Sequence, residues 1–246
     1  MANPVLSRTF APAQQQPWQP TPSGVEVPTI TADKMTMDGA VSRTLALFGV
    51  LVVAATLTWI SGAVALAIPA MFIALGLGLW ASFSRKVRPG VMIAYAAFEG
   101  IFLAGLTYIF ESMFPGIAAQ AVLATLATAG TVFVAYRRQV IRVTPRFRQI
   151  MMFALIGYMV FALLNVMVSL FTGNSAYNSS FGWLIALVGV GLSAFTLVMD
   201  FADIEEGVRA GMPADFEWRA AFGLMVSLVW MYTEILRLLA ILRGDD

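Results

Sequence analysis

Seven long apolar stretches constrain this chain more than any other feature of its sequence. A helix needs about 20 predominantly apolar residues to cross the roughly 30 Å hydrocarbon core of a bilayer. Each stretch is close to that length, and none shows the short alternating pattern of a membrane barrel strand. The stretches predict an all-α integral membrane protein with seven transmembrane helices, at residues 44–60, 64–83, 91–110, 117–136, 150–171, 181–204 and 219–242.

The overall composition favours the same class. Mean hydropathy is +0.81, and charged residues make up 12% of the 246 residues, which is too apolar for an ordinary soluble domain. The alternative is a large soluble helical core, but so many uncharged runs would leave it too little polar surface. We therefore expect the lipid bilayer as a partner and no nucleic acid.

The sequence contains neither cysteine nor histidine. Their absence excludes disulfides, thiol chemistry, a Ser-His-Asp triad, histidine-ligated metals and imidazole pH switches. Proton chemistry near neutral pH must then come mainly from carboxylates in unusual surroundings. An intramembrane aspartyl protease is a weak alternative, because the Gly-x-Gly-Asp context of such enzymes is missing. We expect no enzymatic activity and no cofactor.

The first forty residues differ in composition from the rest of the chain. Residues 1–40 are rich in proline and glutamine and have little apolar surface to bury, which is typical of a disordered segment. We predict a disordered cytoplasmic tail at 1–40 and a seven-helix transmembrane domain at 41–246.

Positive charges are distributed unevenly among the connections. When the seven spans alternate and the N-terminus lies inside, nearly all Lys and Arg residues outside the spans fall on the inner side, and Arg243 alone falls on the outer side. Cytoplasmic loops of membrane proteins carry such an excess. The pattern predicts a cytoplasmic N-terminus and a C-terminus on the opposite side.

Besides Arg219 at the boundary of the seventh span, the last two spans carry four charged residues, which are costly in a membrane. Each costs at least about 2.5–3.5 kcal/mol at the bilayer centre, so we expect Asp200, Asp203, Glu234 and Arg237 to have a function. Glu99 in the third span is either a cavity-lining acid or a hydrogen-bonded packing residue. These alternatives stay open.

The spacing of the four charges predicts two pairs. Asp200 and Asp203 lie three residues apart and share a helix face. Glu234 and Arg237 have the same spacing, so they form a local ion pair that lowers the burial cost of each. Alternatively, Glu234 faces Asp200 and the two carboxylates share one proton, which would sense pH without histidine.

Three short motifs resemble the Bax inhibitor-1-like family, also called the transmembrane BAX inhibitor motif family. The run from Met199 to Ile204 resembles the family's Asp-Thr-x-x-Ile in helix six. The run 232–239, Tyr-Thr-Glu-Ile-Leu-Arg-Leu-Leu, resembles its Tyr-x-Asp-Ile-Ile-Asn-Leu-Phe in helix seven. Residues 98–100, Phe-Glu-Gly, and the seven spans are similar to the bacterial branch. The resemblance covers roughly residues 40–246.

The resemblance implies a fold and an activity. Six helices would surround a central C-terminal helix, and the protein would be a pH-sensitive calcium leak channel in the bacterial cytoplasmic (inner) membrane. By motif match, Asp200 and Glu234 would sense pH and act as transient calcium ligands, since oxygen atoms suit this hard cation. Arg237 would hold the closed state, and Asp203 and Glu99 would assist. The alternative is a non-conducting regulatory membrane protein that binds another membrane protein, such as a protease or stress factor.

The chain departs from the family pattern at the acids. Glu234 replaces the second aspartate, and the family's arginine in helix two has no counterpart in 64–83. A symmetric hairpin around residues 212–213 would place Asp200 opposite 224–227, with Glu234 roughly 10–13 Å deeper. Either the turn is asymmetric, or the two acids line one pathway without touching.

Overall fold

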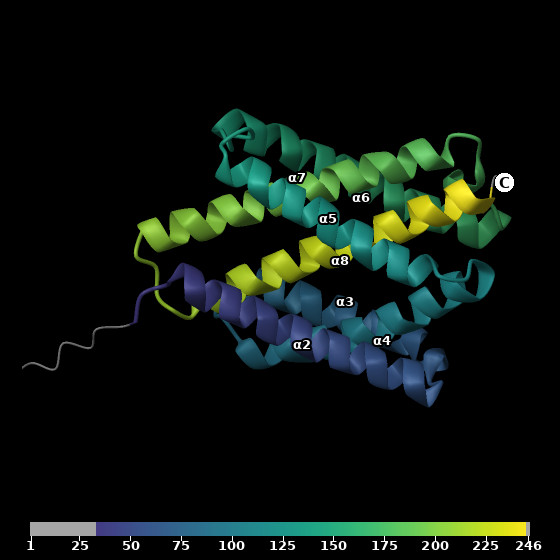
Figure 1. The fold of residues 1–246 in the computed structure, drawn as a ribbon, viewed down its shortest axis with the longest axis horizontal. Helices are drawn as coiled ribbons and strands as arrows, with labels where there is room; N and C mark the ends of the chain where they lie inside the picture. The colour runs from purple at the N-terminus through teal and green to yellow at the C-terminus, as the bar shows by residue number, and fades with distance from the viewer. Residues whose placement is uncertain (1–32, 245–246) are drawn as a thin grey trace, which may run out of the picture. The chain divides into compact units, whose positions relative to one another are not determined.

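The computed structural model describes residues 33–244, which form α-helices and two short 3₁₀ turns but no strand (Figure 1). In this part of the chain, seven spans are long and apolar enough to cross a membrane, and η1 and α3 together make one of them. The predicted fold class is confirmed. The elements are α2 (Met37–Ser61), η1 (Val64–Leu66), α3 (Ala67–Phe83), α4 (Pro89–Met113), α5 (Ile117–Arg137), α6 (Pro145–Thr172), η2 (Ala176–Asn178), α7 (Gly182–Arg209) and α8 (Phe216–Gly244).

Local chemistry sets the ends of the long helix α6. The Thr144 hydroxyl accepts a hydrogen bond from the backbone N–H of Phe147, which satisfies one of the free donors of the first turn. Pro145 follows at the first helical position, where its missing N–H costs nothing. At the other end, Gly173 adopts a left-handed φ of 71°, which glycine tolerates and which ends the helix.

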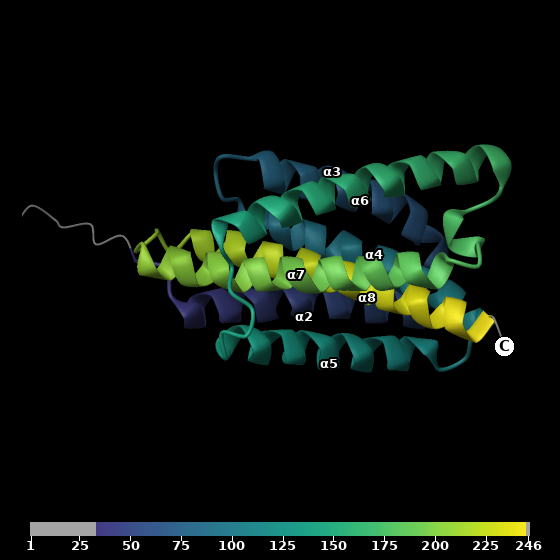
Figure 2. The same cartoon turned by 90° about the horizontal axis from the view of Figure 1, so that it is seen from above.

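Helix α8 has the largest buried share among the described spans. It contacts α2, α4, α5 and α7, and its longest shared surface is with α7 (Figures 1 and 2). By contrast, α3 packs mainly on α4, and α6 packs mainly on α7. The complete ring of six helices predicted around the C-terminal helix is therefore not confirmed.

Glycines in α4 allow α2 and α3 to approach it closely. A Cβ atom at Gly100 would overlap the backbone carbonyl oxygen of Leu51 in α2. A Cβ at Gly105 would overlap the side chain of Ala67 in α3. Small residues at helix contacts are the usual means of close packing in membranes, where association depends on contact between helices rather than on water exclusion.

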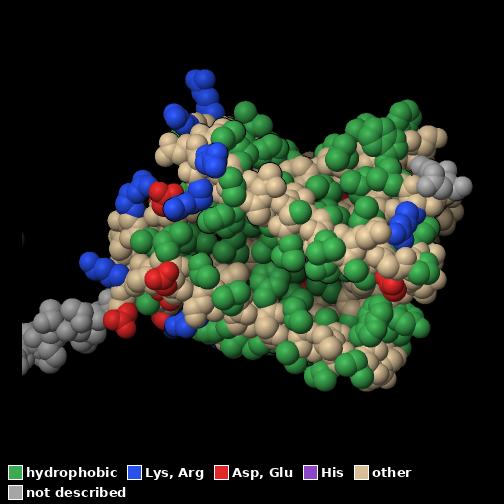
Figure 3. All heavy atoms as spheres, viewed as in Figure 1, with side chains coloured by type: hydrophobic (Ala, Val, Ile, Leu, Met, Phe, Trp, Pro, Cys, Tyr) green, Lys and Arg blue, Asp and Glu red, His purple; other side chains and the backbone are tan. Residues whose placement is uncertain are grey.

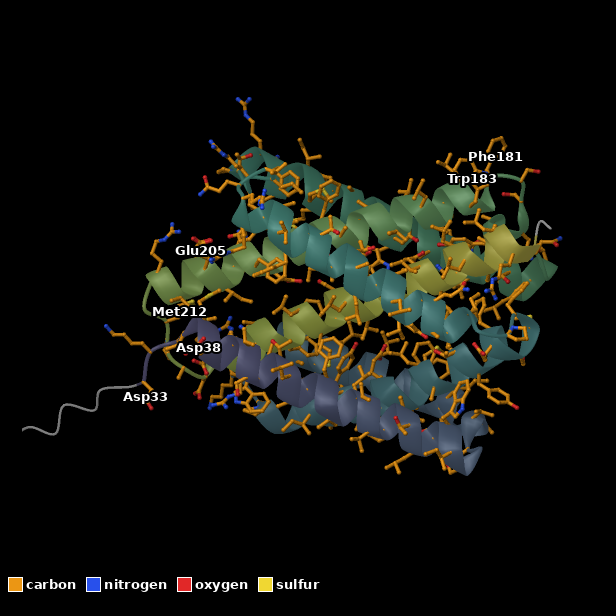
Figure 4. The ribbon with its side chains drawn as sticks, viewed as in Figure 1. Asp33, Asp38, Phe181, Trp183, Glu205 and Met212 are labelled. Carbon is orange, nitrogen blue, oxygen red and sulfur yellow. The ribbon has the colours of Figure 1, made fainter. Side chains whose placement is uncertain are left out.

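The segment before α2 is fastened to the loop between α7 and α8. Met35 donates a backbone hydrogen bond to Met212, and Ala214 donates one to Asp33. The backbone N–H and hydroxyl of Thr36 both donate to the buried carboxylate of Glu217, each at 3.0 Å. Figure 4 shows Asp33, Asp38 and Met212 at this end of the helices. We call residues 33–36 and this loop the N-terminal clasp.

The exterior of the helices suits a bilayer. Large apolar side chains such as Ile60, Phe83 and Phe171 are exposed. On the face seen in Figure 3, hydrophobic side chains cover the middle, and Lys and Arg side chains gather at the end where α7 turns into α8. The described helices therefore meet lipid over their middle section. Of the predicted tail at 1–40, residues 1–32 lie outside the described part, and α2 begins at Met37.

Candidate functional site: two adjoining cavities between α6, α7 and α8

Glu234 is the most strongly engaged acid in the described part of the chain. It lies on α8, 3% exposed, and its Oε1 accepts hydrogen bonds from Tyr158 at 2.8 Å and from Trp230 at 3.1 Å. Its Oε2 pairs with a guanidinium nitrogen of Arg237 at 2.9 Å. The ion pair predicted from the spacing of these two residues is therefore formed.

Aromatic side chains complete this cluster. The guanidinium of Arg237 lies over the ring of Tyr177, 4.4 Å from its centroid, and the hydroxyls of Tyr177 and Tyr158 are 3.0 Å apart. Tyr177 belongs to η2, which is held by Asn165 of α6 through its hydrogen bonds to Ser175 and Ala176. The α6–α7 connection thus covers the Glu234–Arg237 pair.

A cavity of about 1040 Å³ adjoins the cluster. We call it the Glu234 cavity. Its polar lining includes Tyr158, Asn165 and Thr233 besides the ion pair, and its apolar lining includes Phe110 and Val166. Gly189 lets the acid and Tyr158 approach α7, because a Cβ there would lie 2.7 Å from the Glu234 carboxyl carbon. The cavity lies at the end of α8 toward the α6–α7 connection.

Asp200 is hydrogen-bonded to Ser227, whereas a shared proton would require Glu234 as its partner. Its Oδ2 accepts a hydrogen bond from the hydroxyl of Ser227 on α8, and its Oδ1 lies against Gly223. Ser227 precedes Glu234 by two turns of α8, roughly 10 Å at 1.5 Å per residue. Asp200 and Glu234 are thus held by separate partners and do not hydrogen-bond to each other.

A second cavity, of about 740 Å³, is lined by Asp200 and Asp203. We call it the Asp200 cavity. Met35 and Met212 of the N-terminal clasp form part of its lining, as does Arg219 of α8. This cavity therefore lies at the end of α8 opposite the α6–α7 connection.

Asp203 and its neighbours form an exposed ion-pair network. Asp203 pairs with Arg148 of α6 at 2.7 Å, and Arg148 also reaches Glu206 at 3.7 Å. Glu205 accepts a hydrogen bond from Tyr136 and pairs with Arg209. The side chains of Asp203 and Arg148 are 55% and 40% exposed, so this network borders the Asp200 cavity at its solvent end.

Glu99 is the one predicted site residue that the structure sets apart. It is buried in α4, 9% exposed, and it lines neither cavity. The apolar cluster that surrounds this part of α4 includes Tyr95, Phe222 and Met225. Its position agrees better with helix packing than with a cavity-lining role.

Sequence reasoning missed the residues that α6 and η2 contribute. Tyr158, Tyr177 and Arg148 reach the acids only because α6 lies beside α7 and α8. No local motif marks them, since each lies far from Glu234 and Asp203 in sequence. Ser227 had a weak signal, because the symmetric hairpin placed Asp200 opposite 224–227.

The described residues contain no group of three or more Asp, Glu, His or Cys side chains placed to hold a metal ion. Asp200 and Glu234 lie in different cavities, so they do not form one chelating site.

The fold and the site define a multi-pass helical membrane protein with acids in two adjoining cavities between its last three helices. The sequence model of the family described as Bax inhibitor 1 like matches residues 3–244, nearly the whole chain, and the protein belongs to this family. The match begins well before residue 40, the approximate start of the resemblance expected from the sequence. A search of curated proteins finds no match for the chain.

Proposed function

We propose that this protein is a pH-sensitive leak pathway for calcium, or a similar hard cation, across the bacterial cytoplasmic membrane. The observation that carries the proposal is the pair of adjoining cavities along α8, each of which contains one intramembrane acid. Acids inside spanning segments usually mark ion or proton pathways. Together the cavities extend from the α6–α7 connection to the N-terminal clasp.

Each charged residue has a role in this proposal. Asp200 and Glu234 are transient oxygen ligands for the cation. Arg237 holds the closed state, because its guanidinium occupies the Glu234 oxygen that a cation would need. Asp203 assists at the solvent end of the Asp200 cavity, where it pairs with Arg148. Glu99 stays outside the pathway and supports the packing of α4.

The pH sensitivity follows from the ion pair rather than from a shared proton. Protonation of Glu234 removes the negative charge that holds Arg237, and protonation of Asp200 weakens the charge-assisted bond from Ser227. Each protonation weakens one contact that holds the pathway closed. Acidification should therefore open the pathway at two separate points.

We propose that the α7–α8 end faces the cytoplasm, with the N-terminus inside and the C-terminus outside. The distribution of arginine among the connections supports this orientation. A cation entering from outside would then reach the Glu234 cavity first.

One observation favours a second function. Both Glu234 oxygens are engaged by donors from this chain, as expected of a structural acid in a non-conducting protein. Such a protein would regulate another membrane protein by binding to it. The lipid-facing surface of α6, of which little is buried against other helices, offers such a partner the most room.

Calcium-loaded liposomes separate the two functions. Purified protein should release calcium at a rate above that of liposomes prepared with an unrelated helical membrane protein, and acidification should change the rate. The Arg237→Gln variant should release calcium faster, because Glu234 is then free to bind the cation. Release at the background rate at every pH would contradict the leak and favour the regulatory function.

A further inference from the structure

Four residues line both cavities: Leu155 of α6, Thr196 of α7, and Val226 and Ser227 of α8. The two cavities therefore meet at one junction, which all three helices form. Two of its side chains are apolar and two carry hydroxyls. Asp200 lies on one side of this junction and Glu234 on the other.

The junction is held by a contact between helices. The Ser227 hydroxyl donates to Asp200 across the α7–α8 interface. The Thr196 hydroxyl donates to the backbone carbonyl of Ser193, 2.7 Å away, so its oxygen can still accept a hydrogen bond or coordinate a cation. Leu155 and Val226 present apolar surface, which resists the entry of water.

We propose that Ser227 and Thr196 form the barrier between the two cavities, and that the hydrogen bond from Ser227 to Asp200 keeps this barrier closed. A cation arriving at Asp200 competes with Ser227 for the same carboxylate oxygen. Once Ser227 is released, its hydroxyl and that of Thr196 become oxygen ligands beside Asp200, of the kind that hard cations such as calcium prefer. Ser227 and Thr196 thus set both the closure and the selectivity of the pathway. The role in selectivity rests on the proposed leak, whereas the barrier between the cavities can exist without it.

Two substitutions test the barrier by calcium flux. In liposomes that contain the Ser227→Ala variant, the rate of calcium release at rest should rise by about tenfold. This is the shift from closed to open barrier expected when one charge-assisted hydrogen bond is lost. Thr196→Val keeps the shape of the side chain and removes a ligand, so calcium should lose its advantage over a monovalent cation. The matched control is Thr233→Val. The Thr233 hydroxyl also donates to a carbonyl three residues earlier, at 2.8 Å, but it lines only the Glu234 cavity.

Cysteine labelling tests the barrier without any flux, and the chain contains no cysteine of its own. Ala162 lines only the Glu234 cavity, and Ala220 lines only the Asp200 cavity. An impermeant thiol reagent should reach a cysteine at 162 only from the side of the α6–α7 connection, and one at 220 only from the opposite side. Adding Ser227→Ala should let the reagent cross and label each from both sides.

The outcomes separate the two proposals. In one outcome the unaltered protein releases no calcium, its cysteines are labelled from one side only, and Ser227→Ala allows labelling from both sides. This outcome would refute the leak and support the barrier. Calcium release with labelling and flux unchanged by Ser227→Ala would support the leak and refute the barrier. Two-sided labelling of the unaltered chain would also refute it. If Ser227→Ala does not fold, Thr196→Val gives the deciding result, because selectivity equal to that of Thr233→Val would refute the barrier.

Discussion

The carboxylates of this protein differ in burial and in the number of hydrogen bonds and ion pairs that they form with other side chains. Glu234 is buried and accepts from Tyr158, Trp230 and Arg237. Asp203 is half exposed and pairs with Arg148 near solvent. Removing a buried acceptor leaves its donors unsatisfied, whereas an exposed ion pair contributes little to stability.

Glu234→Gln should therefore destabilise the protein much more than Asp203→Asn. The neutral amide keeps one acceptor for Tyr158 or Trp230 but loses the charge opposite Arg237. We expect a loss of about 1–3 kcal/mol for Glu234→Gln and less than about 1 kcal/mol for Asp203→Asn. Thermal unfolding in detergent micelles would measure both. Equal midpoints for the two variants would contradict the described environment of Glu234.

The residue scale also shows where sequence reasoning succeeds. The ion pair of Glu234 and Arg237 could be predicted because both lie on one helix, three residues apart, a spacing that makes their side chains neighbours. The hydroxyls of Tyr158 and Tyr177 could not, because their positions depend on the packing of α6 and η2. Whether Asp200 and Glu234 share a proton depends on the distance between their carboxylates on two different helices. The spacing of the residues along the sequence does not give that distance.

At the scale of the elements, close backbone contacts hold α2 and α3 against α4. Gly100 touches the Leu51 carbonyl, whereas Gly76 of α3 has open space where a Cβ would go. Seven helices could be predicted from apolar length, because a membrane demands that length. The contacts between helices could not be predicted, because nearly every face of these spans is apolar. The periodicity of apolar residues therefore does not show which face packs against a neighbouring helix.

Gly100→Ala should separate α2 from α4, since backbone at Leu51 cannot move aside as a flexible side chain can. We expect a cost of about 1–3 kcal/mol from overpacking. Gly76→Ala is the matched control and should be neutral or slightly stabilising, because alanine favours a helix by up to about 1 kcal/mol relative to glycine. Unfolding titrations in mixed micelles would compare the two. A loss of stability in Gly76→Ala as large as that in Gly100→Ala would contradict the packing.

The N-terminal clasp is a second feature at the scale of the elements, and no sequence motif predicts it. Thr36 donates twice to Glu217, and Met35 lies in the lining of the Asp200 cavity. Thr36→Val removes the hydroxyl donor but keeps the backbone bond and the side-chain shape. We expect faster labelling of a cysteine at 220 from the α7–α8 side, while a cysteine at 162 reacts as before. Unchanged labelling at 220 would show that the clasp does not cover the cavity.

At the scale of the whole molecule, the orientation in the membrane decides which cavity meets which compartment. The arginine distribution predicts that the α4–α5 and α6–α7 connections face outward. Two exposed positions report on this, Asn174 in the α6–α7 connection and Val140 between α5 and α6.

An impermeant thiol reagent added to intact cells should label a cysteine at 174 and spare one at 140. The reverse pattern is expected in inverted membrane vesicles. Double substitution is unnecessary, because each single-cysteine protein serves as the control for the other. Labelling of position 140 in intact cells would overturn the orientation.

The pH dependence of calcium release tests the central claim most directly. Unaltered protein in calcium-loaded liposomes should release calcium at a rate that rises as the pH falls from about 8 to about 5, a range in which carboxylates in an apolar environment can take up a proton. Asp200→Asn and Glu234→Gln should each flatten the profile, and their effects should add, because the two acids have separate partners. Asp203→Asn should keep the slope. Unchanged slopes in folded Asp200→Asn and Glu234→Gln proteins would contradict the account.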